Sequence, residues 1–155
     1  MRVALASPVA SKVRCHAQFA ALPWRISNGT LEILLITTLK TQRWIVPKGW
    51  PIAELSPPAC AAREALEEAG VSGTIGEKPI GYFHYSKRRK DGGAVPCKVE
   101  VFALEVTQQR RTWAEKGARQ SRWCTVTDAL ATVGEPGLRQ LISRFAQSKL
   151  VSSTL

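Results

Sequence analysis

Three glutamates, Glu64, Glu67 and Glu68, fall within five positions of a chain that has only 12 acidic residues. In an α-helix, positions i, i+3 and i+4 lie on one face, so a helix here would gather the three carboxylates. Crowded carboxylates repel one another unless a cation lies among them. Magnesium and manganese prefer oxygen ligands. The spacing therefore predicts a divalent-metal site, with a solvated acidic face paired to Arg63 as the alternative.

The segment around these glutamates carries the signals that start and stop a helix. Ser56 followed by Pro57 is typical of a helix start, because a hydroxyl caps the first turn and proline needs no hydrogen-bond partner there. Gly70 is typical of a helix end, because it adopts the left-handed conformation easily. On the side opposite the glutamates, we expect a stripe of small and aliphatic residues to pack on a sheet. The stripe consists of Ala59, Ala62, Leu66 and Ala69.

The rest of the chain alternates strand and helix patterns. Asn28-Gly29 predicts a hairpin between two strands, and Asp91-Gly92-Gly93 predicts a second turn. Thr127 is expected to cap a short helix, and Glu135-Pro136 to begin a longer one. The predicted strands cover 17–25, 31–39, 98–106 and 121–126, with shorter extended segments at 43–46 and 71–86.

This order of elements predicts an α/β fold, with one mixed β-sheet between helices. A chain of 155 residues is about one domain. We expect a flexible N-terminal segment at 1–15, a domain at 16–148 and a C-terminal tail at 149–155.

The sequence from Gly49 to Val71 resembles the Nudix box, G-x5-E-x7-R-E-U-x-E-E-x-G-U, where U is aliphatic. Six fixed positions match the pattern, a coincidence with odds on the order of 10⁻⁵ at average residue frequencies. One position departs, because Leu55 stands where the box has its first glutamate and Glu54 lies one place earlier. Either Glu54 substitutes through a shifted loop, or Leu55 packs the loop against the helix. The matching residues are Gly49, Arg63, Glu64, Glu67, Glu68 and Gly70.

The resemblance implies an α/β/α sandwich that hydrolyses a pyrophosphate linkage with the help of Mg²⁺ or Mn²⁺. By the same resemblance, Glu67, Glu68 and the carbonyl of Gly49 hold metal, and Arg63 orients the glutamates. Glu64 is implied as a ligand or as the general base. A carboxylate outside the box, such as Glu100, stays open as an alternative base.

A second stretch, from Trp44 to Trp50, is similar to the diphosphoinositol polyphosphate and diadenosine polyphosphate phosphohydrolase branch of this family. Arg43 and Lys48 are therefore candidates for binding substrate phosphates, although ordinary exposed side chains explain them equally well. Arg88 and Arg89 belong to a run of four cations at the second predicted turn. Such a run suits a highly charged substrate, or is simply solvated. Neighbouring aromatic residues, including Phe83 and Tyr85, are expected to pack, with stacking on a base as the alternative.

The chain carries a formal net charge of +10, so the expected partner is an anion. A small polyphosphate substrate fits best. Other nucleoside diphosphate derivatives, RNA 5′ ends and a non-catalytic module that binds a nucleotide or RNA are the alternatives. No apolar run is long enough for a membrane span, and the four widely spaced cysteines favour a reducing cytoplasm. The oligomeric state stays open.

Overall fold

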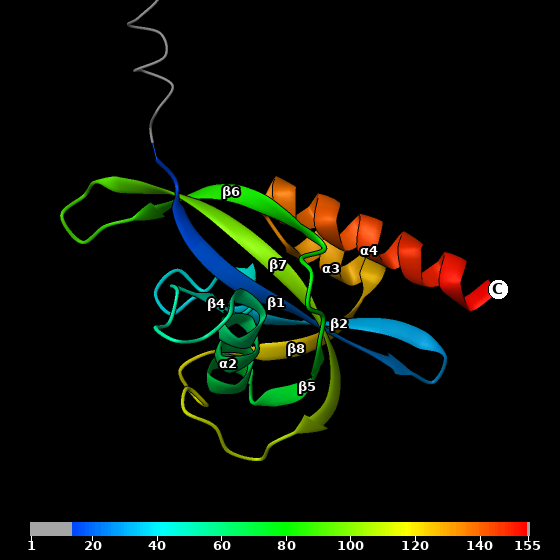
Figure 1. The fold of residues 1–155 in the computed structure, drawn as a ribbon. Helices are drawn as coiled ribbons and strands as arrows, with labels where there is room; N and C mark the ends of the chain where they lie inside the picture. The colour runs from blue at the N-terminus through cyan, green and yellow to red at the C-terminus, as the bar shows by residue number, and fades with distance from the viewer. Residues whose placement is uncertain (1–13, 155) are drawn as a thin grey trace, which may run out of the picture.

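The computed structural model describes residues 14–154, with side chains through residue 150. Its centre is an eight-stranded mixed sheet. Helix α2 covers one face, and α3 and α4 cover the other, which confirms the predicted α/β sandwich (Figure 1). The predicted segment 1–15 lies almost wholly outside the described residues. The elements are β1 His16–Ser27, β2 Thr30–Thr37, β3 Trp44–Ile45, β4 Lys48–Gly49, α2 Pro57–Ala69, β5 Val71–Ile75, β6 Gly81–Arg88, β7 Ala94–Gln109, β8 Ser121–Thr125, α3 Val126–Thr132 and α4 Pro136–Thr154.

The sheet is mixed because its two long central strands, β1 and β7, run parallel while the other pairings are antiparallel. β1 and β2 form the predicted hairpin. Asn28 and Gly29 both have positive φ, at 51° and 78°, as the favoured two-residue hairpin turn requires. β6 and β7 form a second, longer hairpin that projects beyond the body of the molecule (Figure 1).

Two short strands position the loop that precedes α2. β3 pairs with the end of β2, and β4 pairs with β1 through Phe19↔Gly49 and Ala20↔Lys48. The sequence predicted only loop from 47 to 55, because a two-residue strand has no recognisable periodicity. The pairing fixes the backbone of Lys48 and Gly49 to the centre of the sheet.

Helix α2 begins and ends where the sequence predicted. The Ser56 side chain accepts a hydrogen bond from the backbone N–H of Ala59, and Gly70 closes the helix with φ of 70°. The predicted packing stripe was right at Ala69 and wrong at Ala59, Ala62 and Leu66. The residues of α2 in the core beneath it are Ala61, Ala65 and Ala69, one turn apart along the helix.

The physical reason for this difference is that α2 has small residues on two sides, so apolar periodicity alone did not select one. The observed rotation places Ala61 and Ala65 against the sheet and also buries Glu68, which is 7% exposed. The glutamates therefore border the packed face of the helix instead of lying opposite to it. A carboxylate at that border can reach the backbone of β4.

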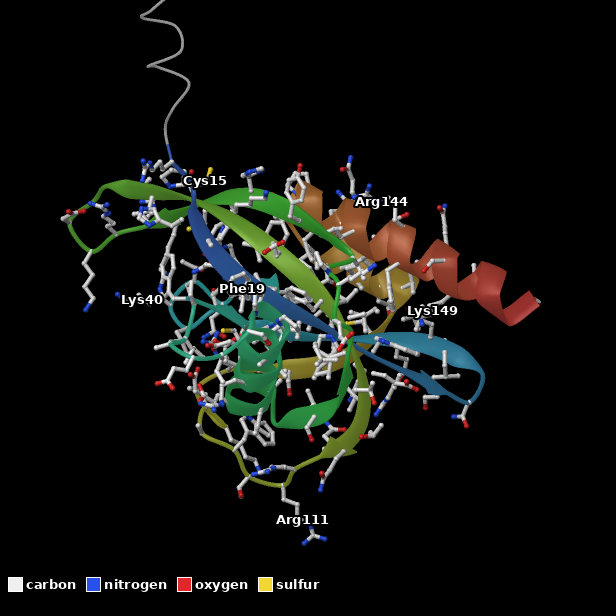
Figure 2. The ribbon with its side chains drawn as sticks, viewed as in Figure 1. Cys15, Phe19, Lys40, Arg111, Arg144 and Lys149 are labelled. Carbon is white, nitrogen blue, oxygen red and sulfur yellow. The ribbon has the colours of Figure 1, made fainter. Side chains whose placement is uncertain are left out.

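Helices α3 and α4 cover the opposite face. Gly137 allows α4 to approach β6 closely, because a Cβ there would lie 2.5 Å from the Cβ of Phe83. Further along α4, the ammonium of Lys149 lies 4.2 Å from the ring centroid of Trp24 on β1 (Figure 2).

One boundary prediction on this side was wrong. Thr125, not Thr127, caps α3, because its hydroxyl is the one placed to accept from Asp128 N–H. α4 continues to Thr154, so the predicted tail from 149 is helical as far as it is described. No helix within residues 14–154 is long and apolar enough to cross a membrane.

Candidate active site

The backbone of β4 and the carboxylates of α2 meet directly. Lys48 N–H donates to Oε1 of Glu68 over 3.2 Å. A Cβ on Gly49 would lie 2.3 Å from Oε2 of Glu64, so that carboxylate occupies the space that any other residue at position 49 would fill. Glycine at position 49 is thus required by the close approach of Glu64. The geometry brings two box carboxylates together with the peptide of Lys48 and Gly49.

Glu64 and Glu68 influence each other's protonation. Burial raises the pKa of Glu68 to about 8, and the attraction of Arg119 opposes this shift without cancelling it. Burial also raises the pKa of Glu64, while a hydrogen bond with Glu68 acts in the opposite direction. Without a metal, the pair formed by Glu64 and Glu68 therefore keeps a bound proton near neutral pH.

Residues that the sequence analysis missed come from the segment between β7 and β8. The guanidinium of Arg119 lies 3.3 Å from Glu68 and 2.7 Å from Glu115. Arg119 is also anchored to β2, because it donates to the carbonyl oxygen of Thr37 over 3.0 Å. Glu115 acts on both Glu64 and Glu68, since its negative charge contributes to raising the pKa of each.

The same segment is fastened to the C-terminal end of α2. The Trp113 ring lies where a Cβ on Gly70 would be, at 2.3 Å. Arg110 N–H donates to the Gly70 carbonyl over 2.8 Å, and Glu115 N–H donates to the Glu67 carbonyl over 3.0 Å. Gly70 is therefore needed both for its left-handed backbone and for this contact. The available sequence signal was the four-residue spacing of Glu115 and Arg119, which allows an ion pair but does not indicate its location.

The structure does not bring every predicted residue into this cluster. Glu67 is half-buried and raises the pKa of Glu64 through its charge. Arg63 is exposed and forms no hydrogen bond or ion pair with any described residue. Glu54 is exposed with φ of 68°, and Leu55 is half-buried with its carbonyl facing the Cys60 thiol. Glu100 lies on β7 opposite Tyr82, and no interaction in the carboxylate cluster involves it.

The donor atoms fit Mg²⁺ or Mn²⁺ in chemistry. Glu64, Glu68 and the Gly49 carbonyl all offer oxygen, and the absence of a side chain at Gly49 lets the Glu64 carboxylate approach the backbone there. Within the described residues, however, no three His, Cys, Asp or Glu side chains are already arranged around one ion position. The positive charge next to Glu68 and Glu115 is instead that of Arg119. The donors at hand are thus two carboxylates and a backbone carbonyl, without a preassembled trio of glutamates.

The predicted substrate residues separate into two groups. Arg43 and Lys48 line a pocket beside β4. Burial lowers the pKa of Lys48 to about 8, and its ammonium lies 4.9 Å from the ring centroid of Tyr85. Arg88 and Arg89 lie at the tip of the β6–β7 hairpin, which projects away from α2 (Figure 1). Neither forms an ion pair with a described residue.

Comparison with known proteins identifies the family. The NUDIX domain model matches residues 17–145, and the chain belongs to the Nudix family. The chain is 34% identical over 119 residues to Nudix hydrolase 12, mitochondrial, of Arabidopsis thaliana, an alignment that covers 74% of this chain and 58% of the relative. It is also 34% identical over 102 residues to mouse diphosphoinositol polyphosphate phosphohydrolase 3-alpha, covering 64% and 58%. The resemblance inferred from residues 49–71 is confirmed.

Solved structures support the same fold. A binary complex of the C. elegans Ap4A hydrolase matches with a TM-score of 0.66 at 21% identity, covering 87% of this chain and 98% of that one. The NUDIX domain of Shewanella oneidensis NrtR complexed with ADP-ribose matches with a TM-score of 0.66 at 16% identity, covering 97% and 99%. This chain spans 58% of the length of each of the two sequence relatives.

Proposed function

We propose that this protein is a metal-dependent hydrolase of a pyrophosphate linkage, acting on a dinucleoside polyphosphate or a diphosphoinositol polyphosphate. The observation that carries the proposal is the contact of Glu64 with Gly49 and of Glu68 with Lys48 N–H. It places two carboxylates and a peptide around one small volume. The mouse diphosphoinositol polyphosphate phosphohydrolase and the C. elegans Ap4A hydrolase support these two substrate classes.

Each residue of the cluster has a role in this reaction. Glu64, Glu68 and the Gly49 carbonyl would hold Mg²⁺ or Mn²⁺, with Glu67 at the outer side of the group. The cation supplies charge that neutralises phosphate oxygens and makes a nearby water more acidic. Glu64 is also the preferred proton acceptor if one of its two oxygens is left free of the metal, because burial raises its pKa above the ordinary carboxyl value. Glu115 is a second candidate for the proton acceptor. It lies outside the box, and its ion pair with Arg119 holds it near Glu68.

Two cations next to the carboxylates, Lys48 and Arg119, would receive the substrate. Lys48 has its backbone at Glu68 and its ammonium in the neighbouring pocket, so it can hold a phosphate between the two. Arg119 is tied to Glu68 and can turn to a phosphate once a metal replaces it there. Other nucleoside diphosphate derivatives and RNA 5′ ends are the alternative substrates. We also propose that the protein acts in the cytoplasm.

The test is a panel of substrates assayed with Mg²⁺ or Mn²⁺. The panel contains diadenosine tetraphosphate, ADP-ribose, a nucleoside triphosphate and diphosphoinositol pentakisphosphate. We expect phosphate or nucleotide release from one of the two proposed classes, with at least a tenfold preference in kcat/KM over ADP-ribose. Glu68→Gln should lower kcat by about 10² to 10³, as loss of a transition-state electrostatic contact does.

A matched control separates this effect from a general loss of negative charge. Glu77→Gln changes an exposed carboxylate between β5 and β6 and should leave kcat unchanged. Equal rates for wild type and Glu68→Gln would contradict the proposal. Tight nucleotide or RNA binding without any product would support the non-catalytic module instead.

A further inference from the structure

A pocket of about 200 Å³ lies on the α4 side of the sheet, beside β4. Trp44, Val46 and Lys48 alternate along one side of the backbone and line it, while Leu138 of α4 faces them. For comparison, an engineered apolar cavity of about 150 Å³ in another protein holds a benzene molecule. The pocket therefore has room for a flat aromatic ring.

Three aromatic side chains, Trp44, Phe83 and Tyr85, contribute to the pocket walls. The ring of Trp44 is fixed by the guanidinium of Arg122, 4.9 Å from its centroid. The Tyr85 hydroxyl is held by Gln18 at 2.7 Å. Rigid aromatic walls suit stacking on a planar ligand, and every nucleobase offers such a face.

One charged side chain of the pocket, Glu135, forms no ion pair with the other residues that line it. Glu135, just before α4, lines the pocket together with Arg43 and Lys48. Across residues 14–150, the ion pairs join Arg25 to Glu32 and Arg119 to Glu68 and Glu115, so none involves Glu135. Glu135 is half-buried, and its carboxylate has no hydrogen-bond partner among the described residues, so both of its oxygens are available to accept hydrogen bonds from a ligand.

These features discriminate between the two substrate classes of the proposed function. A phosphorylated inositol carries anionic groups around its whole ring and needs cations on every side, whereas this pocket offers only Arg43 and Lys48, and its other walls are aromatic side chains and the Glu135 carboxylate. A base has no negative charge, and its sugar phosphates would extend toward Lys48 and the carboxylates on the far side of β4. The pocket is thus suited to the base end of a nucleotide.

We propose that this pocket binds a guanine base, with the Glu135 carboxylate accepting hydrogen bonds from guanine N1–H and the N2 amino group. The inference rests on the proposed function and narrows its substrate to guanine nucleotides. A carboxylate only accepts hydrogen bonds, and guanine presents two adjacent donors on this edge. Adenine presents a ring nitrogen acceptor beside its amino group, so the same carboxylate repels it.

Binding of mononucleotides to the full chain, measured by isothermal titration calorimetry with and without Mg²⁺, tests the inference directly. We expect GMP to bind at least tenfold more tightly than AMP. IMP, which lacks the N2 amino group, should fall between them. Glu135→Gln should reverse the order, because its amide can donate to the ring nitrogen of adenine and accept from the adenine amino group. Glu77→Gln, at an exposed site between β5 and β6, should leave the GMP preference unchanged.

The outcomes separate this inference from the proposed function. Equal affinity for GMP and AMP, or no mononucleotide binding at millimolar concentration, overturns the guanine pocket even if the enzyme hydrolyses diphosphoinositol phosphates. Guanine preference without hydrolysis of any guanine nucleotide overturns the proposed reaction but leaves the pocket. A preference for diguanosine over diadenosine tetraphosphate that disappears in Glu135→Gln supports both.

Discussion

The carboxylates of α2 beside β4 and the cations at the tip of the β6–β7 hairpin are two charged regions of this protein that are built differently. Glu68 is nearly buried and touches Lys48 N–H and Arg119. Arg88 and Arg89 are exposed and form no ion pair with a described residue. The first region has fixed geometry, whereas the second contributes charge without fixed ionic contacts.

This contrast indicates which changes should matter most. Fixed charges in a partly buried site act strongly, because the surrounding water is excluded and the groups need not reorganise. Exposed charges act through a field that salt weakens over about 8 Å at physiological ionic strength. We therefore expect large effects of small changes at β4 and small, salt-dependent effects at the hairpin.

The largest effect should come from Gly49→Ala. The added Cβ would lie 2.3 Å from Oε2 of Glu64, so that carboxylate must move away from the site. Because the obstructed atom is the end of a side chain, the fold should tolerate the change. We expect kcat to fall by about 10² to 10³ with little change in Tm, as measured by steady-state kinetics and thermal denaturation.

Gly76→Ala provides the matched control. Atoms near an added Cβ at position 76 lie at 3.6 Å or more, which is an ordinary contact. This variant should keep wild-type kcat. An active Gly49→Ala enzyme would contradict the assigned position of Glu64.

An intermediate effect should appear in the pH dependence of stability without metal. Glu68 has a pKa of about 8 in the folded chain against an ordinary value of 4.5, so the folded chain binds more protons than the unfolded chain between these values. The free energy of unfolding should therefore fall as pH rises from about 5 to 8, with a slope of at most about 1.4 kcal/mol for each step of one in pH. Urea denaturation in EDTA measures this slope.

Glu68→Gln should flatten the slope, because the amide does not titrate. Mg²⁺ should raise the free energy of unfolding more at pH 8 than at pH 6, since the ion must displace protons from the carboxyl groups. A slope that is identical in wild type and Glu68→Gln would argue against a protonated, buried Glu68.

The smallest effect should come from replacing Arg88 and Arg89 together with alanine. We expect kcat to stay constant and kcat/KM to fall by less than about tenfold, with the loss disappearing at high salt. Replacing two exposed arginines of α4, Arg139 and Arg144, removes the same charge from a helix surface; Arg144 is labelled in Figure 2. An equal loss in both double variants would show an effect of net charge alone.

Local signals predicted the elements of the site well. Ser56 and Pro57 start α2, Gly70 ends it, and Asn28-Gly29 turns the first hairpin. Each of these residues acts through its own backbone or its nearest neighbours in sequence, so its identity is informative by itself. The spacing of Glu64, Glu67 and Glu68 gave the metal-binding hypothesis, and the family pattern from 49 to 71 added the assignment of individual ligands.

Long-range contacts explain what the sequence analysis missed. Arg119 and Glu115 reach Glu68 and Glu64 from about 50 positions away, across the turn between β7 and β8. Glu135 lines the same pocket as Trp44 only because the chain entering α4 folds over the sheet. α2 has two alanine-rich sides, and the helix sequence alone does not show which of them packs on the sheet. The shape of the sheet surface beneath α2 determines this rotation.

The sequence by itself determined the helix that carries Glu64, Glu67 and Glu68, because spacing and capping are local properties of the chain. Only the tertiary structure decided which carboxylates are buried, which cation lies between them and which base-sized pocket adjoins them. Burial and pairing are set by residues distant in sequence, and these alone convert an acidic helix face into a site with shifted pKa values.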